Sequence, residues 1–124
     1  MQSMEQKRAA YAWERVRGRN KEYKNLAKSL PAMVMTNGLM QTLAFLEGKR
    51  SRKEDNKKDP HGELLRDVLG WLKERKHIDK DGFEGAMQSL YEKESGEYRR
   101  ATEEALEILR WIRQLADAAV KDGD

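Results

Sequence analysis

The chain has 124 residues, of which 38% are charged and 38% hydrophobic, and it contains no cysteine. A chain of this length folds around one core, which predicts a single domain over residues 1–124. Without cysteine there are no disulfides and no thiolate metal sites, so we expect a reducing compartment, the cytoplasm. No apolar segment resembles a signal peptide or reaches the roughly 20 residues of a membrane span, so we expect no membrane partner.

The net charge of +3 is unevenly distributed along the chain. Residues 1–30 hold eight Lys or Arg and three Glu, whereas residues 84–124 hold six basic and ten acidic side chains. We interpret the chain as basic in its N-terminal half and acidic in its last helix.

Apolar residues at helical spacing predict a first helix over residues 3–29, which Gly18 weakens. A second helix is expected over residues 31–48, with Pro31 in its first turn and Gly48 at its C-terminal end. Apolar residues surround the axis of this second helix, so we expect it to be the central element of the core.

The polar residues 48–59 follow, and we expect an exposed loop there. Asp59 and Pro60 are typical of the N-cap and first position of a third helix, which ends in the basic KERKH of residues 73–77. A short fourth helix is expected over residues 83–91 and a long one over residues 96–120. The predicted fold class is therefore all-α, a compact helical bundle of about five helices with a long C-terminal helix.

Motifs for catalysis or metal binding are missing from the sequence. His61 and His77 lack a second ligand four residues away, and residues 77–88 lack the acidic first and twelfth ligands of a calcium loop. There is neither a phosphate-binding loop nor a nucleophile elbow. We expect no enzyme, metal, cofactor or small-molecule substrate. The alternative is a small ribonuclease that uses His61 as an acid–base group.

Basic residues provide the candidate binding surface. Four recur at spacings of four and three along the first expected helix: Arg17, Lys21, Lys24 and Lys28. On one continuous helix they would share an arc of about 60°, a stripe able to track phosphates. Four more follow the second expected helix and would extend the stripe if the loop folds back beside it: Lys49, Arg50, Arg52 and Lys53. The alternative is a solvated face that binds nothing.

Asn37 and Gln41 stand four residues apart in the second expected helix, on either side of Gly38. If buried, these amides need hydrogen-bond partners, because an unsatisfied one costs about 1–3 kcal/mol. If exposed, they form a polar gap open to a sugar, a phosphate or a neighbouring subunit. Both interpretations stay open, and Gln41 is a candidate RNA-binding residue.

Several strings resemble one known family. LPAMVMTNGLMQTLAFL follows EYKNLAKS, and HGELLRDVLGWL and YRRATEEALEILRWIRQLADAA come later in the same order. Together they resemble the small subunit of the Cmr complex, the type III-B CRISPR effector that is guided by RNA and acts on RNA. The resemblance covers nearly the whole chain.

The resemblance implies an all-helical, non-catalytic subunit in antiviral defence. Several copies stack as a minor filament beside larger backbone subunits, and their basic surface residues bind the guide RNA and target RNA. The implied partners are the other Cmr subunits, further copies of the chain and both RNAs. The alternative is a helical protein–protein adaptor with no nucleic-acid role.

Overall fold

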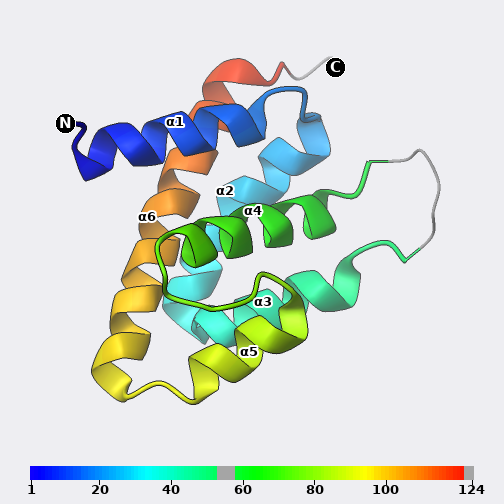
Figure 1. Ribbon diagram of the computed structural model, residues 1–124. Helices are drawn as coiled ribbons and strands as arrows, with labels where there is room; N and C mark the ends of the chain where they lie inside the picture. The colour runs from blue at the N-terminus through cyan, green and yellow to red at the C-terminus, as the bar shows by residue number, and fades with distance from the viewer. Residues whose placement is uncertain (53–57, 122–124) are drawn as a thin grey trace.

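The computed structural model describes residues 1–52 and 58–121, so Lys53 lies outside the described residues. The described residues form helices and no strand (Figure 1). The helices are α1 (Met4–Val16), α2 (Lys21–Asn37), α3 (Leu39–Lys49), α4 (Pro60–Glu74), α5 (Phe83–Tyr91) and α6 (Ser95–Ala119). The all-α fold with a long C-terminal helix is confirmed, although the described residues hold six helices rather than about five.

The single helix expected over residues 3–29 is wrong, because the chain breaks between Val16 and Lys21. Gly18 has a φ of 78°, which side-chain-bearing residues rarely adopt, and this conformation ends α1. Asn20 then caps α2 by accepting a hydrogen bond from the backbone N–H of Tyr23 at 3.0 Å. A glycine stop and an asparagine start therefore override the continuous apolar pattern.

The helix expected over residues 31–48 is also wrong, since Pro31 lies inside α2 rather than at a helix start. Proline has no backbone N–H, so the helix loses one hydrogen bond at this position. Pro31 is buried in the core, and its packing there offsets that loss. Gly38, with φ 93° and ψ 162°, separates α2 from α3. Its N–H still donates to the Val34 carbonyl at 2.8 Å and its carbonyl still accepts from the Thr42 N–H at 3.2 Å.

The later helices lie close to their expected positions. Asp59 caps α4 by accepting from the Gly62 N–H at 3.2 Å, and Pro60 occupies the first turn, as predicted. Helix α5 covers the expected residues, with Gly82 as its N-cap, and α6 begins and ends one residue earlier than expected.

One hydrophobic core joins residues from all six described helices. Helix α4 contributes nine buried residues, whereas residues 31–48, the expected second helix, contribute six from the end of α2 and from α3, so α4 is the central element instead. Figure 1 shows α4 crossing the middle of the molecule, with α1 on one side and α3 and α5 on the other. Trp71 of α4 is the largest of the fully buried side chains.

The acidic α6 packs against the basic α1 and α2 of the same chain. The Arg8 guanidinium donates to both carboxylate oxygens of Glu104, at 2.7 and 2.8 Å, and Lys28 pairs with Asp117 at 3.4 Å. The charge asymmetry seen along the sequence is thus partly neutralised within the folded chain.

A buried polar cluster holds the α1–α2 turn against α4. The Arg19 guanidinium contacts Glu63 at 3.0 Å and Asp67 at 3.1 Å. The Tyr23 hydroxyl donates to the Asp67 carboxylate at 2.6 Å, and the Tyr11 hydroxyl donates to the Asp67 backbone carbonyl at 2.7 Å. Burial raises the pKa of the Asp67 carboxyl and raises the pKa of Tyr11 to about 12. These bonds fix α1 beside α4.

Candidate nucleic-acid interface

The predicted basic stripe is not continuous, because its residues belong to two helices. Arg17 is the C-cap of α1 and pairs with Glu14 at 3.2 Å, whereas Lys21 begins α2 and is exposed. Lys24 is buried, with its Nζ donating to the Val120 carbonyl at 3.1 Å, and Lys28 pairs with Asp117. The prediction that these four residues share one arc of a helix is therefore wrong. Their contact with RNA remains a prediction.

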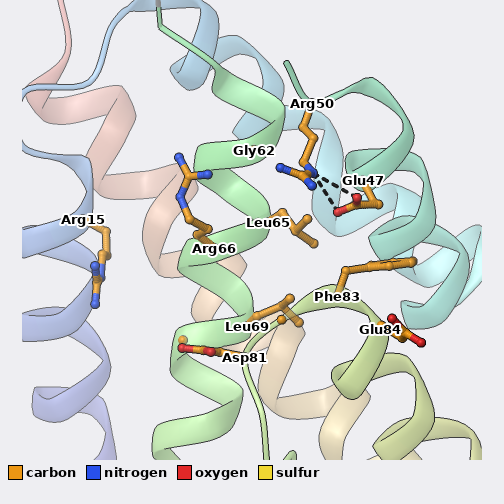
Figure 2. Close-up of a pocket in the computed structure, with 12 residues that line it drawn as sticks. Arg15, Glu47, Arg50, Gly62, Leu65, Arg66, Leu69, Asp81, Phe83 and Glu84 are labelled. Atoms are coloured by element: carbon orange, nitrogen blue, oxygen red, sulfur yellow. Dashed lines mark hydrogen bonds and ion pairs between the residues drawn. The ribbon is translucent and has the colours of Figure 1, made fainter. Parts of the chain in front are cut away.

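The second basic group lies at the end of α3. The Arg50 Nε bonds to both carboxylate oxygens of Glu47 at 2.9 Å, and the Arg52 guanidinium reaches the same carboxylate at 3.3 Å. Lys49 is exposed. Because α4 lies between α1 and α3, Arg50 lies across α4 from α1 rather than beside it (Figure 2).

A groove with a volume of about 680 Å³ runs over α4. Its floor is one face of that helix, formed by residues at spacings of three and one: Gly62, Leu65, Arg66, Leu69 and Gly70. Figure 2 shows α1 on one side of this face, α3 on the other, and the start of α5 below it. Residues from four helices therefore surround the groove.

Three arginines from three elements line this groove: Arg15 of α1, Arg66 of α4 and Arg50 at the end of α3. Arg66 is exposed and makes no ion pair within residues 1–52 and 58–121. The Arg15 guanidinium lies 4.6 Å from the centroid of the Tyr11 ring, which holds it over the α1 side. The three guanidinium groups are thus presented by separate, packed elements.

Two glycines let the neighbouring elements approach α4. A Cβ at Gly70 would lie 2.7 Å from the Tyr11 hydroxyl, too close for a real contact. A Cβ at Gly62 would overlap the Asp59 carboxylate and lie 3.3 Å from the Cβ of Arg50. The glycines therefore set how closely Arg15 and Arg50 lie beside the α4 floor.

Carboxylates also line the groove, so its charge is bipolar. Glu47 is occupied by Arg50 and Arg52, while Asp81 and Glu84 lie beside the start of α5. Figure 2 shows Arg50 and Arg66 toward the Gly62 end, and Asp81 and Glu84 toward the other. An anionic group therefore fits best at the Gly62 end.

Of the three groove arginines, sequence reasoning identified Arg50 and missed Arg15 and Arg66. A signal for Arg66 was present, because Gly62, Arg66 and Gly70 recur every four residues and so share one helix face. Arg15 had no such signal, since its position depends on how α1 docks against α4.

Asn37 and Gln41 are both exposed, so the interpretation as a buried amide network is wrong. Asn37 ends α2 and Gln41 lies in the first turn of α3, on the two sides of Gly38. Tyr98 of α6 approaches this break, and its hydroxyl accepts a hydrogen bond from the Met40 N–H at 3.2 Å. The amides are therefore free to meet a partner.

The two histidines lie apart from this groove. The His61 ring packs edge-on against Phe45, with centroids 5.6 Å apart, and burial lowers the pKa of His77. In the described part of the chain, no three His, Cys, Asp or Glu side chains come together as a metal site. No helix there combines the length and apolar character needed to cross a membrane.

Known proteins are similar to this chain in sequence and in fold. The family model for CRISPR-associated protein (Cas_Cmr5) matches residues 4–119. The CRISPR system Cmr subunit Cmr5 of Thermus thermophilus is 31% identical over 129 residues, covering 98% of this chain and 100% of the relative. The crystal structure of a CRISPR-associated Cmr5 family protein from Thermus thermophilus matches with a TM-score of 0.74 and 30% identity, over 97% of this chain and all of that one.

Proposed function

Because this chain belongs to the Cmr5 family of CRISPR-associated proteins, subunits of the Cmr complex, we propose how it serves that complex. It acts in the type III-B effector as a non-catalytic structural subunit that binds the guide RNA and target RNA in antiviral defence. Its partners are the backbone subunits and further copies of itself, stacked as a minor filament.

The three-arginine groove supports RNA binding. Guanidinium groups displace counterions from phosphates and bind them in a sequence-independent way. In an RNA-guided complex, base pairing between guide and target supplies the sequence information, so a subunit needs only backbone contacts. Arg15 and Arg66 provide such contacts from one side of the molecule, and Arg50, whose Nε is held by Glu47, provides one through its two terminal nitrogens.

Six of the predicted residues are exposed and would add RNA contacts: Arg17, Lys21, Lys28, Gln41, Lys49 and Arg52. Arg52 shares Glu47 with Arg50, so it is the nearest candidate to the groove. Lys28 would have to leave Asp117 to contact a phosphate, and Lys24 supports the fold through Val120.

Exposed apolar side chains support contacts with other protein subunits. Trp13, Met35 and Tyr91 expose 45%, 67% and 65% of their surface. Exposed aromatic and methionine side chains are enriched at protein interfaces. The same side chains would serve a helical adaptor with no nucleic-acid role, so the presence of RNA separates the two functions.

The first experiment is affinity purification of the tagged chain from its host, with identification of bound proteins and RNA. Cmr subunits with short RNAs that share a repeat-derived end support the proposal. Protein partners without RNA would support the adaptor. Cleavage of labelled RNA that is lost in His61→Ala would support the ribonuclease instead, and we expect no cleavage.

Salt dependence then tests the groove. Three phosphates of a single strand neutralised by Arg15, Arg50 and Arg66 give a slope of log K against log salt of about −2.1, roughly a 20-fold loss between 50 and 200 mM salt. Replacing Arg15 and Arg66 by Gln should reduce the slope to about −0.7. The matched control replaces Arg99 and Arg113 of α6, which are exposed and form no ion pair in the described chain.

A further inference from the structure

The groove over α4 has an apolar part between its charged ends. Leu65 and Leu69 lie beneath the groove with only 4% and 1% of their surface exposed, so the half-buried Phe83, the first residue of α5, presents the apolar surface on one side. Phosphates gain nothing from such a surface, because it offers them no donor. The phosphate-binding role proposed above therefore leaves this part of the groove unexplained.

We propose that the groove holds an unpaired RNA base, with the base against Phe83 and its phosphate at Arg50 and Arg66. This inference rests on the proposed RNA-binding role and names the part of the strand that enters the site. Single-stranded nucleic acid commonly binds in this way, through basic side chains on the backbone and an aromatic ring under a base. A base-paired strand cannot use the site, since its base faces are covered by neighbouring bases.

The bipolar charge of the groove suits a nucleotide, which is itself bipolar. A phosphate is anionic, while adenine, cytosine and guanine carry an amino group that donates hydrogen bonds. The carboxylates of Asp81 and Glu84 lie at the end opposite Arg50 and Arg66, where such an amino group finds acceptors (Figure 2). Lys73 approaches Asp81 only to 4.0 Å, so both Asp81 oxygens keep acceptor capacity.

A base preference follows from this arrangement. Uracil has no amino group, so its edge offers the two carboxylates fewer donors than the edge of adenine or cytosine does. The groove should therefore bind adenine or cytosine in preference to uracil. The volume of about 680 Å³ lies within the range of about 300–1,000 Å³ that is usual for small-ligand sites.

The test compares fluorescently labelled hexamers of adenosine, cytidine and uridine with an abasic ribose-phosphate hexamer. Anisotropy titrations with the full chain at low salt give the four affinities. We expect adenosine and cytidine hexamers to bind at least about fivefold more tightly than the uridine hexamer, and the abasic one to bind most weakly. Phe83→Leu should weaken binding of the adenosine hexamer at least about fivefold and leave the abasic hexamer unchanged.

Matched variants separate the site from general effects. Tyr91→Leu replaces an exposed aromatic residue at the far end of the same helix and should change no affinity. The double variant Asp81→Ala and Glu84→Ala should abolish the preference over uridine while raising the affinity for the abasic hexamer, because repulsion of phosphates is removed.

The outcomes distinguish the two proposals. If Arg66→Gln weakens all four hexamers while Phe83→Leu and the base identity have no effect, the base site is overturned and the RNA-binding groove stands. If the wild-type chain binds none of the hexamers, or Arg66→Gln changes nothing, both proposals fail for this groove. Equal weakening by Phe83→Leu and Tyr91→Leu also overturns the base site.

Discussion

Glu104 of α6 joins three parts of the fold, and its replacement tests how α1 and α4 are held. Its carboxylate accepts two hydrogen bonds from Arg8, at 2.7 and 2.8 Å, and one from the indole N–H of Trp71 at 2.9 Å. Trp71 is fully buried, and Glu104 is the hydrogen-bond partner of its N–H in the intact fold. The perturbation is Glu104→Ala.

The expected cost comes from these three bonds. A hydrogen bond to a charged group contributes about 1.5–3 kcal/mol, and a buried donor left unsatisfied costs about 1–3 kcal/mol. Arg8 is partly exposed and regains hydration, and the contributions are not additive, so we expect a loss of about 3 kcal/mol in the free energy of unfolding. For a domain of this size, that lowers Tm by roughly 10 °C.

Urea denaturation followed by circular dichroism measures the loss. Glu104→Gln keeps one carbonyl acceptor and should lose about half as much. Glu103→Ala replaces the exposed neighbour, which makes no ion pair within residues 1–52 and 58–121, and should stay within about 0.5 kcal/mol of the wild type. A Glu104→Ala variant that is as stable as Glu103→Ala would refute the role of the carboxylate.

Further predictions concern pH, backbone strain and the buried cluster. The hydrogen bonds from Arg8 lower the pKa of Glu104 below its usual value of 4.5, so the stabilisation by this carboxylate is complete at pH 7 and is lost as pH falls through the lowered folded-state pKa. The difference in unfolding free energy between the wild type and Glu104→Gln should therefore close in that range, and a constant difference from pH 7 to pH 3 would contradict this. Gly38→Ala forces a side chain into a φ of 93° and should lower the free energy of unfolding, measured by thermal denaturation, by about 1–3 kcal/mol. Gly48→Ala, within α3 with open space around it, should raise it by up to about 1 kcal/mol, and equal effects of the two variants would show that position 38 does not require glycine. Tyr23→Phe removes the donor to Asp67 and should cost about 1–3 kcal/mol in urea denaturation, and an unchanged midpoint would argue against the buried cluster as a support of α1.

The C-terminal half of the fold was predictable because local signals and packing agree there. Asp59 and Pro60 mark the start of α4, and the small residues of α6, such as Ala101 and Ala105, are buried along its seam as their spacing predicts. Strong amphipathic periodicity then fixed the faces that meet the core.

The N-terminal half was mispredicted because apolar periodicity continues across two breaks. Gly18 and Gly38 adopt positive φ and end their helices, and Asn20 restarts the chain as an N-cap. Pro31 appeared to be a helix start, yet tertiary packing keeps it inside α2. A local penalty at one residue was thus outweighed by burial of the whole helix.

The candidate site was only partly predictable from the sequence. Arg50 lies in the groove as one of the predicted basic residues, whereas Lys24 uses its ammonium group to bind the Val120 carbonyl. Arg15 and Arg66 line the same groove because Gly70 lets the Tyr11 hydroxyl of α1 approach α4, a relation between distant segments that spacing along one helix does not contain. Positions of charges depend on tertiary docking even where the charges themselves are plain in the sequence.

The most direct test of RNA binding through the groove is ultraviolet cross-linking of RNA to this chain within the purified Cmr complex. Mass spectrometry of the cross-linked peptides then locates the contacts. We expect RNA adducts on the peptides around Arg15, Arg50 and Arg66, and none around Arg99 and Arg113 of α6. Adducts confined to α6, or a chain without adducts in a complex that holds RNA, would contradict the proposed role of the groove.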